Sequence, residues 1–554
     1  MPLPLRLHGA RTLLSVCLSA CLSTAPAAWA ASTDPGWPSA GHDLRNSRHQ
    51  TGEHRINPGS VGKLVKRWEF NTAGDVTANP AVEGDFLYVP DSLGWLYKLN
   101  RHTGALVWKS AVAGLTGVPG DFARATPAIS GDLLILGNQS GRLMGAGFGQ
   151  ADAAPARVFA VNKHTGAAAW VTQVDATPYS YITHSALVVD GTAYVGTASN
   201  EELLSAFVPK LFWQWNFRGS VTALDVATGA IKWQTYTVPQ GYHGGAIWGS
   251  TGAVDRQRGL LFMATGNNYM VPQAVLDCQA SGGGEAACQS PHNHVDSIIA
   301  LDLATGAIRW GRRGLPNDTW SVACGLNVPG AITIGPGFAG VYANCPNGNP
   351  ATAGPDHDFA QGPLLFNGED NQLLVGAGQK SGVFWAFRAG DGQLAWARQV
   401  APGGVTGGLQ WGSATNGRDI FVAVANSGPS TNGGGAGAQP WALKDGTVTT
   451  AGGWAALDAR TGALQWTTRD PNGSRAEGAV SLANNVVFGC NMAAGLGTLR
   501  ALHAQTGQPL WSYDSGAPCT AGPSIVDGMV YWGSGTFGLF GPTGPKKLFA
   551  FGLD

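Results

Sequence analysis

An eleven-residue motif recurs along this chain and limits its possible folds more than any other feature. ALDARTGALQW at 456–466 is one copy: a small residue, an apolar residue, Asp, a Thr-Gly pair and a closing Trp. In each copy an apolar segment leads into a turn whose Gly tolerates a positive φ, and a second strand then carries the Trp. Recurrence of this kind predicts a repeat architecture built from β-hairpins. Seven copies end at Trp108, Trp170, Trp233, Trp310, Trp396, Trp466 and Trp511.

A second pattern precedes each hairpin and supplies two more strands, as in GPSIVDGMVYWG from Gly522. Four strands in each repeat are typical of the blades of a β-propeller. We therefore predict an all-β fold, an eight-bladed β-propeller, as one domain over residues 31–554. The eight copies begin at Ala78, Ala125, Ser185, Gly252, Gly362, Gly412, Gly478 and Gly522.

The hairpins number one fewer than the patterns that precede them, and the chain ends explain the difference. KLVKRWEF, which contains Trp68, has no partner strand before it, and KKLFAFGLD follows the last pattern. We expect these N- and C-terminal strands to close the last blade together, because such closure removes a free sheet edge.

The N-terminus predicts export. Arg6 and Arg11 precede the apolar run TLLSVCLSACL, and Ala28-Trp29-Ala30 offers a cleavage site, so residues 1–30 are interpreted as a signal peptide and the location as periplasmic. Leu-Ser-Ala-Cys ending at Cys21 also fits a lipobox, which leaves a lipid anchor as an alternative. The formal net charge of −1, without a basic run, argues against a nucleic-acid partner.

Six cysteines follow the signal peptide, and an even number in an exported chain indicates disulfides. Six cysteines allow 15 connectivities. The simplest pairs nearest neighbours: 278–288, 324–345 and 490–519. No C-x-x-C-H sequence is present, so no c-type haem is attached covalently.

Three segments interrupt the repeats, at 200–218, 267–296 and 317–361. Each interrupts a hairpin at a comparable point, so we expect all three on one face of the propeller. Because a propeller is a scaffold, activity is expected in these loops and at the mouth of the ring.

The repeats and several segments resemble the quinoprotein alcohol dehydrogenases, and within them the polyvinyl alcohol dehydrogenases. The segments are GDFARATPAI, SNEE, GPDHDF, GGLQWGSA and SGAPCTAGPSIVDGMVYWGSG. Members of that family are periplasmic propellers that bind pyrroloquinoline quinone (PQQ) and Ca²⁺ on the ring axis. Many relatives carry adjacent cysteines near the quinone, and this chain has no Cys-Cys pair.

The resemblance implies a role for each matching residue. The metal ligands would be Glu201 (with Glu202 as the alternative), Asn267 and Asp358, and Asp358 would also be the general base. Trp248 would stack on the quinone. The remaining cofactor contacts would come from Arg124, Thr183, Lys380 and Trp411.

These residue types suit the chemistry. Oxidising an alcohol through a quinone requires a base for the O–H proton, a hydride acceptor and a Lewis acid, and carboxylate and amide oxygens suit Ca²⁺. Relatives that use lanthanides carry a second Asp two residues after the base, where this chain has Ala360. The sequence therefore predicts Ca²⁺. If Asp356 were the base, Asp358 would be the added ligand and the preference would reverse.

The predicted function is oxidation of an alcohol, either secondary or polymeric, with electrons passed to a separate acceptor such as cytochrome c. Two alternatives remain. One is a non-catalytic scaffold lipoprotein of the outer-membrane assembly type, which the lipobox favours. The other is a sugar- or polymer-binding propeller that uses the aromatic loop at 203–217.

Overall fold

The computed structural model describes residues 36–139, 154–206, 208, 210–316, 318–325, 344–348, 353–426, 438–536 and 544–554. Residues Asp34–Asp554 form one compact unit. The predicted signal peptide and Cys21 lie outside the described residues. No helix among the described residues has the length and apolar character needed to cross a lipid bilayer.

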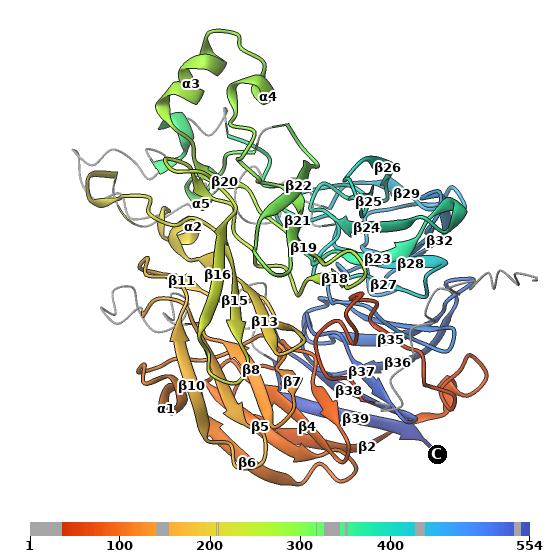
Figure 1. The fold of residues 1–554 in the computed structure, drawn as a ribbon. Helices are drawn as coiled ribbons and strands as arrows, with labels where there is room; N and C mark the ends of the chain where they lie inside the picture. Colours follow the sequence, from red (N-terminus) through yellow and green to blue (C-terminus); the bar gives the residue numbers. More distant parts are fainter. Residues whose placement is uncertain are drawn as a thin grey trace, which may run out of the picture. The chain divides into compact units, whose positions relative to one another are not determined.

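Eight antiparallel blades of four strands follow one another through the described part of the chain, and the sheet of one blade gains a fifth, parallel strand from the N-terminal segment, which confirms the eight-bladed propeller (Figure 1). Blade 1 contains β3 (Ala81–Glu83), β4 (Phe86–Pro90), β5 (Trp95–Asn100) and β6 (Leu106–Ala111); blade 2 contains β7 (Ala128–Ser130), β8 (Leu133–Gly137), β9 (Arg157–Asn162) and β10 (Ala168–Gln173). Blade 3 contains β12 (Leu187–Val189), β13 (Thr192–Gly196), β15 (Ser220–Asp225) and β16 (Ile231–Tyr236); blade 4 contains β18 (Ala253–Asp255), β19 (Leu260–Ala264), β21 (Ser297–Asp302) and β22 (Ile308–Arg313). Blade 5 contains β23 (Leu364–Asn367), β24 (Leu373–Gly378), β25 (Val383–Arg388) and β26 (Leu394–Gln399); blade 6 contains β27 (Ala414–Thr415), β28 (Asp419–Val424), β31 (Gly453–Asp458) and β32 (Leu464–Arg469). Blade 7 contains β33 (Ser481–Ala483), β34 (Val486–Cys490), β35 (Thr498–His503) and β36 (Pro509–Asp514); blade 8 contains β37 (Ser524–Val526), β38 (Met529–Gly533), β39 (Lys547–Leu553) and β2 (Leu64–Asn71).

Short elements fill the connections between and within the blades. The two-stranded ribbons are β11 (Ser180–Tyr181) with β14 (Ala198–Ser199), β17 (His243–Gly244) with β20 (Asn268–Met270), and β29 (Trp441–Ala442) with β30 (Val448–Thr449). The α-helices are α1 (Val112–Thr116), α2 (Glu201–Leu204), α3 (Gln273–Ala280), α4 (Glu285–Cys288) and α5 (Val322–Gly325). The 3₁₀-helices are η1 (Val61–Lys63), η2 (Lys210–Phe212), η4 (Pro346–Gly348) and η6 (Glu369–Asn371). Four of these α-helices, α2 to α5, lie in the predicted interruptions of the repeat.

The repeated Trp residues join each blade to the next. The Trp310 Nε1–H, for example, donates to the carbonyl of Ala389 in the following blade at 3.2 Å. The same bond recurs around the ring at 2.7–3.2 Å, from Trp68, Trp108, Trp170, Trp233, Trp396, Trp466 and Trp511. A buried indole N–H that finds an acceptor keeps the apolar area of its ring in the interface without loss of a hydrogen bond. The recurrent motif is therefore explained by packing between blades.

The Gly of the same motif is required for this packing. Gly306 has φ +73°, and a Cβ at this position would lie 2.4 Å from the ring of Trp233. Replacing Gly306 by Ala is expected to combine a left-handed backbone penalty of about 1–2 kcal/mol with a steric penalty of about 1–3 kcal/mol. Gly259→Ala is the matched control, since φ there is +64° and a Cβ would meet no atom within 4 Å. Thermal melts of both variants measure the difference, and equal melting temperatures would contradict the packing explanation.

The two ends of the chain share blade 8, as the sequence predicts. Strand β2 pairs antiparallel with β39, from Leu64 opposite Leu553 to Asn71 opposite Lys547. Trp511 of blade 7 donates to the Leu64 carbonyl and so joins this composite blade to its neighbour at 3.0 Å.

Residues 36–50, which we call the axial strap, contact the first strands of most blades. The first strands of blades 1, 2, 4, 5, 6 and 7 each donate a backbone N–H to a carbonyl of this segment. The donors are Val82, Ile129, Val254, Leu365, Thr415 and Leu482, and the acceptors in the same order are Trp37, Pro38, Leu44, Arg45, Ser47 and Arg48. Near its end, β1 (His49–Gln50) pairs in parallel with β33. The strap therefore runs past the innermost strands, close to the ring axis.

Three disulfides join Cys278 to Cys288, Cys324 to Cys345 and Cys490 to Cys519, with Cα–Cα distances of 5.7, 5.0 and 6.2 Å. This confirms the nearest-neighbour pairing. The first two lie within inserted segments, where a covalent link limits the freedom of loops that have little core of their own.

Candidate functional site

A cavity of about 230 Å³ lies where the connections into the first strands meet the inserted segments. Arg124, Thr183, Trp248 and Trp411 immediately precede the first strands of blades 2, 3, 4 and 6, so the propeller itself brings them together. The inserted segments add Glu202, Tyr269, Trp320, Asp356 and Asp358. The cavity is thus lined both by residues of the repeated propeller connections and by residues of the inserted segments.

Six of the eight predicted site residues line this one cavity: Arg124, Thr183, Trp248, Asp358, Lys380 and Trp411. Glu201 and Asn267 are buried outside the lining. Asn267 still contacts the site, because its backbone N–H donates to Asp358 Oδ1 at 2.7 Å.

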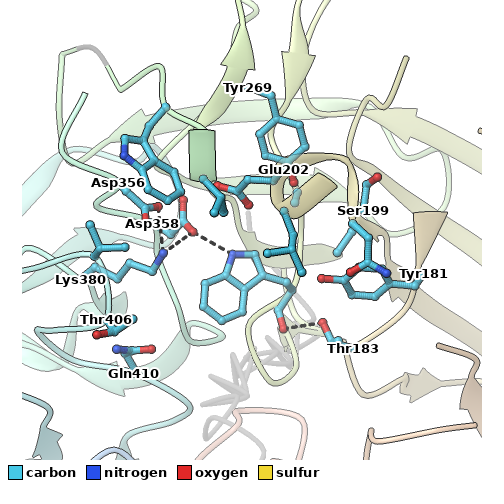
Figure 2. Close-up of a pocket in the computed structure, with 18 of the residues that line it drawn as sticks. Tyr181, Thr183, Ser199, Glu202, Tyr269, Asp356, Asp358, Lys380, Thr406 and Gln410 are labelled. Atoms are coloured by element: carbon cyan, nitrogen blue, oxygen red, sulfur yellow. Dashed lines mark hydrogen bonds and ion pairs between the residues drawn. The ribbon is translucent and has the colours of Figure 1, made fainter. Parts of the chain in front are cut away.

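Asp358 accepts hydrogen bonds from three donors, and Figure 2 shows that one of them, Lys380, joins it to a second carboxylate. Lys380 Nζ donates to Asp358 Oδ2 and to Asp356 Oδ1, both at 2.9 Å, and Trp248 Nε1 donates to Asp358 Oδ2 at 3.0 Å. Burial acts to lower the pKa of Lys380, but the carboxylates of Asp356 and Asp358 outweigh it and raise that pKa. Lys380 therefore stays charged beside Asp358.

Asp318 fixes the segment that carries both carboxylates, and no sequence motif indicated it. Its side chain is 1% exposed and accepts the backbone N–H groups of His357 at 2.6 Å and Asp356 at 3.1 Å. Asp356 has φ +56°, a conformation that non-glycine residues seldom adopt without local support. Burial raises the pKa of Asp318 to about 7.

The two adjacent glutamates at the start of α2 have different surroundings. The Glu201 carboxylate accepts the backbone N–H groups of Asn216 at 3.1 and 3.2 Å and of Phe217 at 3.0 Å, which ties α2 to the following loop. Glu202 lines the cavity, and its carboxylate accepts no hydrogen bond from the described residues. Burial, followed by the nearby Asp358, raises the pKa of Glu202 to about 8. Figure 2 shows Glu202 on the side of the cavity that faces Asp356 and Asp358.

The Asn267 amide has a fixed orientation. Its Nδ2 donates to the carbonyls of Trp320 at 2.8 Å and Asn268 at 3.1 Å. Two carbonyl acceptors identify this end of the amide as the nitrogen, which leaves Oδ1 as its potential metal ligand. Glu202, Asp358 and Asn267 together offer carboxylate and amide oxygens, a donor set that suits a hard cation such as Ca²⁺.

Two indoles line the other part of the cavity. The rings of Trp248 and Trp411 lie 5.5 Å apart at 75°, and the Arg124 guanidinium lies 5.3 Å from the centre of the Trp411 ring. Thr183 Oγ1 donates to the Trp248 carbonyl at 3.0 Å and supports the position of that residue. Flat apolar faces beside Arg124 and Lys380 fit a planar ligand that carries acidic groups.

The family model described as outer membrane protein assembly factor BamB matches residues 62–312 and 380–539. Residues 313–379, which contain Asp318, Asp356 and Asp358, lie between the two matched ranges. The shared pattern therefore covers most of the propeller, whereas two of the three carboxylates that line the cavity, Asp356 and Asp358, come from a segment outside it.

Two similar sequences are described as polyvinylalcohol dehydrogenases. The one from Sphingopyxis sp. (strain 113P3) is 28% identical over 533 residues, which are 89% of this chain and 71% of the relative. The one from Pseudomonas sp. is 28% identical over 544 residues, which are 92% of this chain and 74% of the relative. The solved quinohemoprotein alcohol dehydrogenase from Comamonas testosteroni has the same fold, with a TM-score of 0.64 at 19% identity over 94% of this chain and 80% of that chain.

Proposed function

We propose that this chain oxidises an alcohol with PQQ and Ca²⁺. The chain belongs to the family described as outer membrane protein assembly factor BamB and is a PQQ-dependent alcohol dehydrogenase-like propeller. The observation that carries the proposal is the convergence of Asp358, Lys380, Trp248 and Arg124 on one cavity. These residues come from separate blades and insertions, and a scaffold that only joins other proteins has no physical need for them at one place.

The residues of the cavity divide the work of binding. Trp248 would stack on a planar face of PQQ and Trp411, whose ring lies at 75° to that of Trp248, would line the same site, while Arg124, Thr183 and Lys380 would contact the polar edge of PQQ. Glu202, Asn267 and Asp358 would hold Ca²⁺; in this proposal Glu202 takes the place that the resemblance first gave to Glu201, because Glu202 faces the cavity. When bound, PQQ supplies a quinone that accepts hydride, and Ca²⁺ supplies a Lewis acid.

The proton of the alcohol would pass to the Asp358 carboxylate. Its Oδ2 is 2.9 Å from Lys380 Nζ and 3.0 Å from Trp248 Nε1, so both the position and the negative charge of this carboxylate are supported. A fixed carboxylate of this kind is suited to general-base work. Lys380 is also placed to stabilise negative charge that develops close to Asp358 during the reaction.

The proposed substrate is a secondary or polymeric alcohol. Tyr181, Tyr269 and Trp320 line the cavity together with Leu203 and Val322, so its wall is largely aromatic and aliphatic. Trp215 packs 5.5 Å from Tyr269 and extends this aromatic wall into the loop after α2. Phe207 of that loop lies outside the described residues. The description of two relatives as polyvinylalcohol dehydrogenases supports the same substrate class.

The proposed setting is the periplasm, where a separate acceptor such as cytochrome c would take the electrons. The basic and apolar N-terminal residues and the sequence Ala28-Trp29-Ala30 support this location, and Cys21 would carry the lipid if the lipobox is used. Cell fractionation followed by mass spectrometry of the mature N-terminus distinguishes the soluble form from the anchored form.

Reconstitution tests the function directly. Metal-free protein is incubated with PQQ, with Ca²⁺, with both or with neither, and then assayed with an electron-accepting dye and with a series of secondary alcohols and polyvinyl alcohol. We expect turnover only with both additions. Protein that binds neither PQQ nor Ca²⁺ would instead favour the scaffold function that the matched family description suggests.

A further inference from the structure

The charges that line the cavity are unevenly distributed. Glu202, Asp356 and Asp358 lie on one side, and Lys380 is hydrogen-bonded to both aspartates. The Arg124 guanidinium lies 5.3 Å from the centre of the Trp411 ring. Three carboxyl groups and two cations do not by themselves favour a ligand with several negative charges. A further positive charge near Trp411 would change this balance.

The axial strap places a buried cation in that position. Arg48 is 1% exposed, has φ +49°, and donates from Nε to the Val480 carbonyl and from Nη2 to Asn79 Oδ1, both at 2.9 Å. Its Nη1 is buried without a hydrogen-bond partner among the described residues. None of the described carboxylates forms an ion pair with it, and burial lowers the pKa of the guanidinium to about 10.

Arg48 lies directly beside the residue that follows Trp411. A Cβ built on Gly412 would lie 3.2 Å from Arg48 Nη1, and one built on Gly522 would lie 2.9 Å from Nη2. The guanidinium therefore fits between two glycines of the connections that enter blades 6 and 8. Since Trp411 lines the cavity and Gly412 contacts Arg48, the charge lies immediately behind the cavity wall.

We propose that Arg48 is a specificity-determining residue that makes the Trp411 side of the cavity electropositive and so selects a ligand with several carboxylates. The inference rests on the proposed function, in which that ligand is PQQ. Arg124 would contact the carboxylates, and Arg48 would attract them through the field of its charge from behind Trp411. A buried charge without a partner is unfavourable in the empty protein, and an anionic ligand offsets part of that penalty.

The effect of this charge extends beyond hydrogen-bond distance. Coulomb attraction between unit charges about 10 Å apart, at an effective dielectric constant of about 20, corresponds to a change of about tenfold in affinity. Screening by salt is weak for a charge that is fully buried.

Equilibrium dialysis with Ca²⁺ present tests the inference through binding rather than turnover. Arg48→Met removes the charge but keeps a side chain of similar length, and Arg48→Lys keeps the charge. Arg45→Met is the control that removes another cation of the axial strap; the Nη2 of Arg45 donates to Asn367 Oδ1 at 3.1 Å. The ligands are PQQ and its trimethyl ester, which has the same rings without the three negative charges. Thermal melts of the ligand-free proteins report folding.

We expect Arg48→Met to weaken PQQ binding about tenfold and to change ester binding less than twofold, with Arg48→Lys and Arg45→Met close to the wild type. Equal weakening of PQQ and the ester, or unchanged PQQ binding in Arg48→Met, would overturn the inference. Failure of the wild-type protein to bind PQQ would instead overturn the proposed function. If Arg48→Met does not fold, loss of PQQ affinity without loss of ester affinity in Arg48→Gln provides the same test.

Discussion

Asp358→Ala is expected to lower kcat by about 10²–10⁴-fold at saturating PQQ and Ca²⁺, because the variant lacks the base that accepts the alcohol proton. The propeller should remain folded, since the Trp and strand contacts between blades do not involve this side chain. Circular dichroism and thermal melts check the fold, and the dye assay gives kcat. A purified variant that keeps full kcat under saturating conditions would show that Asp358 is not the base.

Asp356→Ala is the matched control for this prediction. Asp356 bonds to the same Lys380 Nζ at the same 2.9 Å and also lines the cavity, but in the proposed mechanism it accepts no proton from substrate. We expect a reduction in kcat of no more than about tenfold, from weaker positioning of Lys380. If Asp356→Ala were inactive and Asp358→Ala active, the roles would exchange and the expected metal would change with them.

Glu202→Gln is expected to weaken Ca²⁺ binding by at least about 100-fold. The variant loses a charged ligand. Substitution of residues that only orient metal ligands already lowers metal affinity by about 10–100-fold. Calcium titration of the metal-free protein, followed by calorimetry in the presence of PQQ, measures the change. Activity of wild-type protein restored by La³⁺ but not by Ca²⁺ would contradict the choice of metal and the choice of Asp358 as base.

Glu201→Gln distinguishes the structural role of Glu201 from the proposed metal-binding role of Glu202. Its carboxylate accepts the N–H groups of Asn216 and Phe217, so neutralising it is expected to lower stability by about 1–3 kcal/mol while Ca²⁺ affinity stays within about threefold of wild type. The opposite pattern, with lost Ca²⁺ binding in Glu201→Gln and retained binding in Glu202→Gln, would restore Glu201 as the ligand.

The propeller could be predicted because each blade repeats the same physical solution. The Trp and the positive-φ Gly are both needed where one blade packs on the next, as Trp233 packs on Gly306. Composite blade 8 also followed from a count of unpaired strands. The axial strap gave no such signal, because its backbone carbonyls make the contacts and backbone groups place little restriction on residue type.

The cavity was predictable where residues precede the repeated strands and less so inside the insertions. Arg124 and Trp411 occupy fixed places before β7 and β27. In contrast, contacts between α2 and the loop at 216–217 decide which of Glu201 and Glu202 faces the cavity. Asp318 lies 38 residues before Asp356, and only folding of the insertion brings the two together. No local spacing encodes that contact.

Blade 8 also sets the order in which the molecule can be completed. Strand β2 ends at Asn71 and must wait for β39, which begins at Lys547. Contacts between residues so distant in sequence form slowly, because the intervening chain has to lose its freedom first. Until then, seven blades would form an open arc in which strand β2 has unpaired edges and the face of blade 7 that packs on blade 8 is largely uncovered. Such edges readily pair with other chains, so the interval before β39 arrives is the period of greatest risk of aggregation.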